Sequence, residues 1–191
     1  MLNKTAMCLA RKLLRHRVIQ EESLDVYVYG FELLLSFLFT TLLIIAIGLI
    51  LQKGLETIAF LVVFILLRSY SGGYHASKYY ICTLVTISVF SIVMLLSHFV
   101  TVSIVAYPFL GVSGLIALFA WAPIENPNKE ITPKRKTIYK YVSIGIFLAF
   151  LAFGILMNSY VSVISSTVFY TLCADIILMF PCIFKKGEKT R

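Results

Sequence analysis

The stretch FELLLSFLFTTLLIIAIGLIL, residues 31–51, decides the fold class, because it is apolar almost throughout and long enough to cross a bilayer as one helix. A transmembrane helix needs about 20 such residues, since the hydrocarbon core is about 30 Å thick. The rest of the chain has the same character: 60% of its 191 residues are hydrophobic, 14% are charged, and the mean hydropathy is +0.92. Soluble domains contain more charge and less apolar surface, so the sequence is that of a membrane protein.

Further apolar stretches follow along the chain, at residues 55–67, 79–96, 99–121, 141–157 and 160–180. Together with the first, they predict an all-α fold, a polytopic membrane bundle of about six transmembrane helices. The stretch at 55–67 is short for a span. We expect either that residues 68–70 extend it or that neighbouring helices bury its end.

The segment before the first span, residues 1–29, alternates basic and apolar side chains at near-helical spacing. This pattern predicts an amphipathic helix that lies on an anionic membrane surface. The segment lacks a compact apolar core followed by small residues, so we expect no removable signal peptide. The predicted organisation is an amphipathic segment at 1–29, a six-span membrane domain at 30–184 and a basic cytoplasmic tail at 185–191.

The distribution of positive charge predicts the orientation. If the N-terminus is cytoplasmic, sixteen of the seventeen Lys and Arg residues lie on the cytoplasmic side, and Lys53 alone lies outside. Cytoplasmic segments of membrane proteins carry such an excess, so we expect a multi-pass protein of the cell membrane with both termini in the cytoplasm. Because topology explains the net charge of +8, no nucleic acid is expected as a partner.

The polar stretch RSYSGGYHASKYYIC, residues 68–82, separates the second and third spans and faces the cytoplasm in this topology. Gly72 and Gly73 permit positive φ and a sharp reversal of the chain. Ser77 can cap the next helix, which places Cys82 in the first turns of that helix. The helix dipole, Lys78 and a His75 imidazolium all favour a thiolate on Cys82, and a thiolate is the nucleophilic form of cysteine.

His75 and Cys82 are seven residues apart, so a continuous helix would separate them by about 10 Å along its axis. Proton transfer needs about 3 Å. A catalytic dyad therefore requires that the backbone around His75 leave the helix and fold back over its first turn. The alternative interpretation is that His75 is a loop residue and Cys82 a small packing residue.

The four cysteines, at positions 8, 82, 173 and 182, form no CxxC pair, and we expect free thiols. A zinc site that combines His75 and Cys82 with distant ligands is conceivable, but no paired metal-ligand spacing supports it. Neither a metal nor another cofactor is expected.

The arrangement of Arg68, Gly72, Gly73, His75, Ala76 and Cys82, followed by APIENPNK at 122–129 and a basic stretch, resembles the accessory gene regulator protein B family of Gram-positive bacteria. The resemblance covers the whole chain. It implies a membrane-embedded cysteine endopeptidase of peptide quorum sensing. Such an enzyme removes the C-terminal tail of a small precursor peptide at the cytoplasmic face and holds the remainder as a thioester. An internal Cys or Ser of the precursor then closes a thiolactone or lactone ring.

The resemblance also implies roles for individual residues. By position, Cys82 is the nucleophile and His75 is its general base. Arg68, Gly72 and Gly73 shape the site or hold the substrate. The expected partners are the precursor peptide, the lipid bilayer and a second copy of the chain in a homodimer.

Two further groups are candidates for the same site. Asp175 is an acidic residue within an apolar stretch, about as deep from the cytoplasmic face as Cys82, and it either orients His75 or pairs with a polar group for structural reasons. The cations of the central loop either steer an acidic substrate tail or only fix the topology. They are Lys129, Lys134, Arg135 and Lys136.

Two other classes of function remain open from the sequence. A small transporter or exporter of peptides would need polar residues deep in several spans, and few are present apart from Asp175. A scaffold without catalytic activity would need none of the chemistry assigned to Cys82.

Overall fold

The computed structural model describes residues 2–16, 18–72, 79–124 and 132–180. Within these residues the chain is helical and contains no strand, which confirms the all-α prediction. The elements are α1 (Leu2–Arg15), the short 3-10 helix η1 (Glu21–Ser23), α2 (Leu24–Ile50), α3 (Gly54–Ser71), α4 (Tyr79–Phe99), α5 (Ala106–Trp121), α6 (Pro133–Met157) and α7 (Ser162–Ile177).

The helices have the length and composition of a membrane bundle. Among the residues described, four helical stretches are long and apolar enough to cross a bilayer: Glu21–Ile50, Gly54–Ser71, Tyr80–Phe99 and Pro133–Met157. The other two apolar helices, α5 and α7, have 16 residues each. The six-span count therefore stays a prediction, while the helical membrane bundle is shown.

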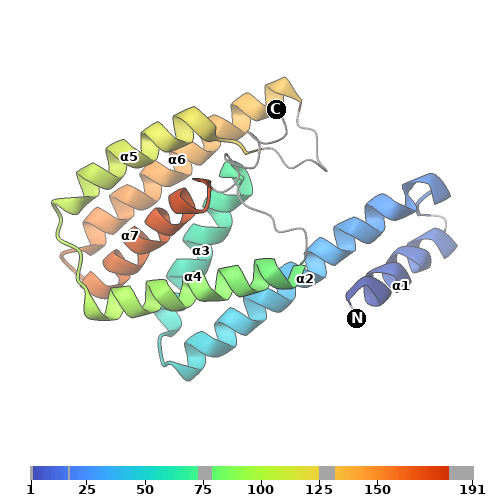
Figure 1. Cartoon of the computed structure of the whole chain (residues 1–191), viewed down its shortest axis with the longest axis horizontal. Coiled ribbons are helices and arrows are strands. Elements are labelled where there is room, and N and C mark those ends of the chain that lie inside the picture. Colours follow the sequence, from blue (N-terminus) through green and yellow to red (C-terminus); the bar gives the residue numbers. More distant parts are fainter. Residues whose placement is uncertain (1, 17, 73–78, 125–131, 181–191) are drawn as a thin grey trace.

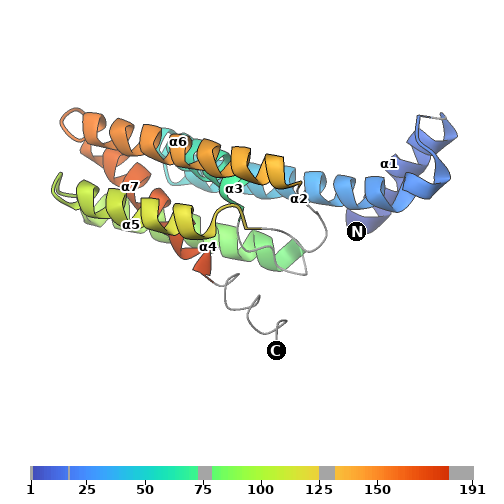
Figure 2. The same ribbon diagram turned by 90° about the horizontal axis from the view of Figure 1, so that it is seen from above.

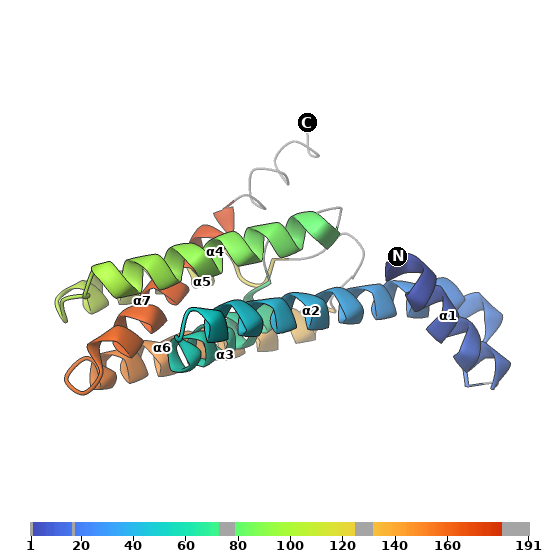
Figure 3. The same ribbon diagram turned by 90° about the horizontal axis from the view of Figure 1, so that it is seen from below.

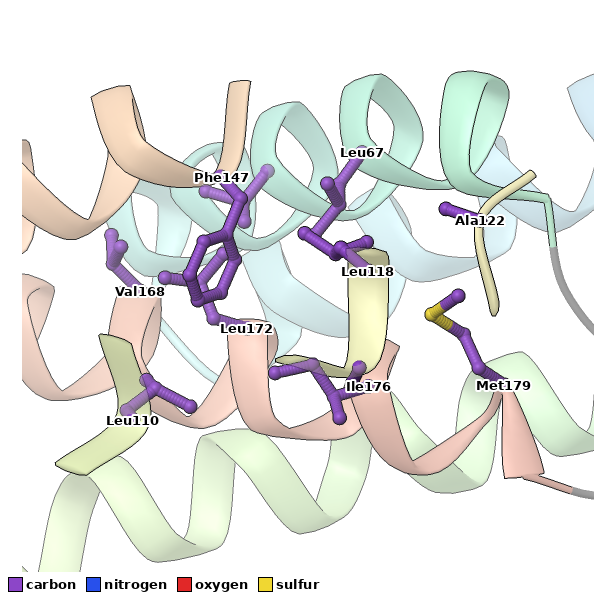
Figure 4. Close-up of a cluster of buried hydrophobic side chains, with 11 residues drawn as sticks. Leu67, Leu110, Leu118, Ala122, Phe147, Val168, Leu172, Ile176 and Met179 are labelled. Atoms are coloured by element: carbon purple, nitrogen blue, oxygen red, sulfur yellow. The ribbon is translucent and has the colours of Figure 1, made fainter. Parts of the chain in front are cut away.

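Helix α7 lies at the centre of the bundle, where it packs against α3, α4, α5 and α6 (Figures 1 and 2). One hydrophobic core joins α7 to α3, α5 and α6, and Figure 4 shows its side chains meeting between the four helices. A second core joins α2, α3 and α4, with residues of α7 packed against it. The buried side chains of these two cores include Phe60, Leu67, Phe90, Leu118, Phe147 and Leu172.

Two sequence predictions about the spans have opposite outcomes. The short second stretch is extended as expected, because α3 continues to Ser71 and so includes residues 68–70. The stretch predicted at 99–121, in contrast, begins seven residues before α5, the helix that it is meant to describe. Helix α4 continues to Phe99, and residues 100–105 connect it to α5 without a helix. Apolar β-branched residues dominate this connection, so hydropathy does not reveal the break, although such residues favour a helix only weakly.

The N-terminal segment forms the predicted helix, and this helix packs on another helix. Figures 1 and 3 show α1 folded back along the first part of α2. Ala6 and Ala10 are fully buried against Val28, and the Asn3 side-chain amide donates a hydrogen bond of 2.5 Å to the Glu32 carboxylate. The boundary predicted between residues 29 and 30 lies within α2. This one continuous helix packs against α1 with its first part and belongs to the bundle with the rest.

A buried polar network ties α5, α6 and α7 together at the end of the bundle opposite the α3–α4 connection. The Tyr107 hydroxyl donates to the Ser165 carbonyl (2.9 Å) and contacts the Ser165 hydroxyl (2.5 Å). Ser165 in turn donates to the Gly154 carbonyl (2.8 Å) and to the Asn158 side chain (3.2 Å). These contacts join the start of α5, the end of α6 and the start of α7.

Candidate active site

The predicted reversal after the second span begins at Gly72, which ends α3. Gly72 has φ +73° and ψ −165°, and its N–H donates to the Arg68 carbonyl at 3.2 Å. Backbone in this region of positive φ is adopted readily only by glycine, so the predicted conformational role of Gly72 is confirmed. Three candidate residues of the same stretch, Gly73, His75 and Lys78, lie outside the described residues.

The beginning of the central polar loop holds the Gly72 turn in place. The Ile124 N–H donates to the Ser71 carbonyl at 3.0 Å, and Ser71 is buried. A Cβ atom on Gly72 would lie 2.5 Å from the Ile124 carbonyl oxygen, so no other residue fits without displacing that backbone. Sequence reasoning missed the role of Ser71 and Ile124, because a backbone contact between distant segments has no sequence motif of its own.

Cys82 lies near the beginning of α4, as predicted. Its thiol is free and half-buried. The Thr86 hydroxyl donates to the Cys82 carbonyl at 2.9 Å, and the Thr83 and Thr40 hydroxyls, 2.9 Å apart, tie this part of α4 to α2. The backbone N–H groups of a first helical turn have no partner within the helix, and they can therefore hold a developing negative charge. His75 precedes the start of α4 by four residues, so the dyad stays a prediction.

Asp175 lies near the end of α7 and Arg68 lies near the end of α3. Asp175 is 4% exposed, and neither of its carboxylate oxygens has a hydrogen-bond partner within the described chain. The charged group that acts on it electrostatically is Arg68, whose guanidinium lies 5.3 Å from the centre of the Phe64 ring. Figure 1 shows α7 ending near α3, against which it packs, while the first turns of α4 continue past that end. The structure therefore associates Asp175 with Arg68, and no hydrogen bond joins it to Cys82.

Three of the candidate loop cations lie in the first turn of α6. Lys134, Arg135 and Lys136 are exposed there, directly after Pro133, while Lys129 is outside the described residues. Cations at a helix N-terminus oppose the helix dipole, which costs about 0.3–1 kcal/mol each in exposed positions. Helix stability therefore does not explain these cations, and their two expected roles, in topology and in anion attraction, stay predictions. Later in α6, the Lys140 ammonium lies 4.0 Å from the centre of the Phe119 ring and links α6 to α5.

Comparison with known proteins identifies the family of the chain. The family described as Accessory gene regulator B matches residues 6–181. An AgrB-like protein of Clostridium perfringens strain 13 is 28% identical over 164 residues, which cover 82% of this chain and 77% of the relative. A second, from strain SM101, is 31% identical over 158 residues, with 76% and 74% covered.

A more distant relative comes from another genus. An AgrB-like protein of Halalkalibacterium halodurans is 26% identical over 152 residues, which cover 78% of this chain and 76% of the relative. No solved structure matches the chain. Because the family match extends from α1 to the end of the bundle, the chain belongs to the Accessory gene regulator B family and has a role in the agr quorum-sensing system.

Proposed function

We propose that this protein is a membrane-embedded cysteine endopeptidase that removes the C-terminal tail of a small quorum-sensing propeptide. The observation that carries the proposal is the position of Cys82, a free and half-buried thiol near the beginning of α4. A thiol in this position has the backbone N–H groups of a helix terminus beside it and is partly shielded from water. Family membership supports the substrate class, since the agr system signals through peptides.

The reaction proceeds by acyl transfer. His75 takes the thiol proton as the Cys82 sulfur attacks the carbonyl carbon of the scissile peptide bond. The C–N bond breaks, the same proton passes to the departing amine, and the N-terminal part of the propeptide remains on Cys82 as a thioester. An internal thiol or hydroxyl of the bound peptide then attacks the thioester carbon and gives its proton to His75. The bond to the Cys82 sulfur breaks, and His75 returns the proton to this sulfur. The product is a cyclic thiolactone or lactone.

Partial burial of Cys82 favours cyclisation over hydrolysis. Water competes with the internal nucleophile for the thioester, and a site that excludes water suppresses this side reaction. N–H groups of the first turn of α4 stabilise the tetrahedral oxyanion, and losing one such donor typically costs about 10²–10³ in rate. The cations at the start of α6 attract the acidic tail of a substrate. The enzyme acts at the cytoplasmic face of the membrane, and it does so as a homodimer.

Replacement of Cys82 by Ala tests the proposal. Cells would express the full-length protein together with a tagged candidate propeptide that carries an internal Cys or Ser and an acidic C-terminal tail, and mass spectrometry would measure the loss of this tail. We expect Cys82→Ala to abolish tail removal while the protein still inserts into the membrane. Cys8→Ala is the matched control, because Cys8 is an exposed thiol of α1, and it should retain activity. Normal processing by Cys82→Ala would refute the proposal.

The exporter alternative gains no support from the polar residues of α7. Its buried hydroxyls are engaged in hydrogen bonds within the bundle: Ser166 accepts from the Val102 N–H, Thr167 donates to the Val163 carbonyl, and Thr171 donates to the Thr167 carbonyl. Hydroxyls that are bonded to backbone groups in this way are satisfied inside the bundle, so they are no sign of a polar path for a peptide.

A further inference from the structure

Cys82 lies on the face of α4 that is turned toward the bundle. Side chains eleven residues apart on a helix are three turns apart and within about 20° of each other around the axis. Val93 follows Cys82 by eleven residues, and it is 2% exposed in the core that joins α2, α3 and α4. The half-buried Cys82 thiol is therefore directed to the inner side of its helix.

The beginning of α4 is less deeply packed than the rest of this helix. The first buried side chain after Cys82 is Phe90, about two turns later, and Val93 and Met94 follow it. Figure 1 shows that the first turns of α4 continue past the end of α7, one of the helices against which α4 packs. The hydrophobic core alone therefore does not fix the rotation of α4 at the level of Cys82.

A hydrogen bond between two threonines holds this part of α4 to α2. The Thr40 and Thr83 hydroxyls are 2.9 Å apart, and the Thr40 hydroxyl also lies 2.8 Å from the Ser36 carbonyl of its own helix. Thr83 is the residue after Cys82, and the Thr86 hydroxyl donates to the Cys82 carbonyl at 2.9 Å. Hydroxyls that bond across helices help to join helices inside a membrane. The contact with α2 therefore fixes α4 within one residue of the thiol.

Thr83 and Cys82 belong to the same turn of one helix, so they move together. Adjacent residues lie about 100° apart around the axis, and this angle separates the direction of Thr83, which contacts α2, from the direction of Cys82. A rotation of α4 that separates the Thr83 hydroxyl from Thr40 therefore also carries the Cys82 sulfur around the axis. A displacement of about 1 Å in a reacting group can cost about a hundredfold in rate.

From these contacts we infer that Thr40 is a positioning residue, because its hydrogen bond to Thr83 fixes the rotation of α4 and holds the Cys82 sulfur on the inner side of the helix. The inference rests on the proposed function and adds to it a residue of α2, a helix in which the sequence indicates no site residue. Thr40 itself does not touch the reacting atoms. It acts through Thr83 on the direction of the thiol.

Three substitutions on α2 separate the hydrogen bond from its surroundings. Thr40→Val keeps the shape of the side chain and removes the hydroxyl. Thr40→Ser keeps the hydroxyl and should behave as the unaltered protein does. Thr41→Val is the matched control, because it removes a hydroxyl from the next residue of α2 and leaves the pair of Thr40 and Thr83 intact.

The first measurement follows the direction of the Cys82 thiol in the full-length protein in lipid nanodiscs. A charged methanethiosulfonate reagent reaches thiols from water, whereas N-phenylmaleimide also reaches thiols that face lipid. Mass spectrometry of peptides gives the ratio of the two labelling rates at Cys82 and at Cys8, an exposed thiol that serves as the internal reference. We expect Thr40→Val to lower the ratio at Cys82 roughly tenfold, because a charged reagent enters hydrocarbon poorly. The ratio at Cys8, and both ratios in Thr40→Ser and Thr41→Val, should not change.

The second measurement is the rate of tail removal from the tagged candidate propeptide at saturating concentration. Thr40→Val should lower this rate by about tenfold or more and leave KM nearly unchanged, because a displaced sulfur slows the chemical step and not the binding of the peptide. Thr40→Ser should restore the rate. Thr83→Val should cost as much as Thr40→Val, and the double variant should cost no more than either, since both changes remove the same interaction.

Several results would overturn the inference. They are an unchanged labelling ratio or normal tail removal in Thr40→Val, equal losses in Thr40→Val and Thr40→Ser, and additive losses in the double variant with Thr83→Val. Each of them would leave the proposed function standing. Normal tail removal by Cys82→Ala, in contrast, would overturn the proposed function and the inference with it.

A cross-link tests the contact in case Thr40→Val fails to insert into the membrane. In the Cys82→Ala background, Thr40→Cys combined with Thr83→Cys should form a disulfide on mild oxidation, because the two hydroxyls are only 2.9 Å apart. Thr41→Cys combined with Thr83→Cys is the control pair and should stay reduced. Absence of the cross-link in the first pair, or equal cross-linking of both pairs, would overturn the inference.

Discussion

Replacing Asp175 by Leu should stabilise the protein. Asp175 is 4% exposed, and neither carboxylate oxygen has a hydrogen-bond partner within the described chain. A buried polar group without a partner costs about 1–3 kcal/mol. For a chain of this size, each kcal/mol shifts the melting temperature by about 2–4 °C, so Asp175→Leu should raise it by roughly 2–12 °C. Asp175→Asn keeps the polar atoms and should melt close to the unaltered protein.

Thermal unfolding of the full-length protein in one detergent, followed by circular dichroism, provides the measurement. Thr171→Val is the control, because its hydroxyl already donates to the Thr167 carbonyl at 2.7 Å and its removal should bring no gain. If Asp175→Leu unfolds at a lower temperature than the unaltered protein, Asp175 is held by a favourable interaction and the reasoning fails. A stabilised Asp175→Leu with reduced propeptide cleavage would show that Asp175 is kept for activity at the expense of stability.

Three further predictions concern packing and hydrogen bonds. Gly114→Ala should lower stability by about 1–3 kcal/mol in denaturant titrations, because its Cβ would overlap the Phe147 ring; an unchanged midpoint would contradict this packing. Tyr107→Phe removes the hydroxyl bonded to Ser165 and should cost about 1 kcal/mol by thermal melting, so equal melting would contradict the network. Asn3→Ala removes a hydrogen bond between α1 and α2, and trypsin should cut α1 faster; unchanged cleavage would show that the bond does not hold α1 in place.

The sequence predicts the features that depend on local composition. Apolar stretches identify the helices because transfer to lipid depends on side-chain hydropathy along a single helix. The double glycine identifies the turn after α3, because positive φ is a local property of the residue, and Gly72 confirms it. The basic and apolar alternation identifies α1 in the same way.

Features that depend on contacts between distant segments could not be predicted. Helix α1 buries Ala6 and Ala10 against α2, and small residues of this kind give no hydropathy signal that distinguishes a helix partner from a membrane surface. The contact between Gly72 and Ile124 joins backbone atoms of segments far apart in the chain, so no sequence motif predicts it. The electrostatic influence of Arg68 on Asp175 depends on how α7 rotates against α3, which a single sequence does not encode in any local pattern.

The hydrogen-bond network around Tyr107 and Ser165 fastens α5, α6 and α7 to one another at the end of the bundle opposite Gly72. Helices that are fastened at one end separate more easily at the other end. We therefore expect any separation of these three helices to begin at the opposite end of the bundle, where α4 carries Cys82.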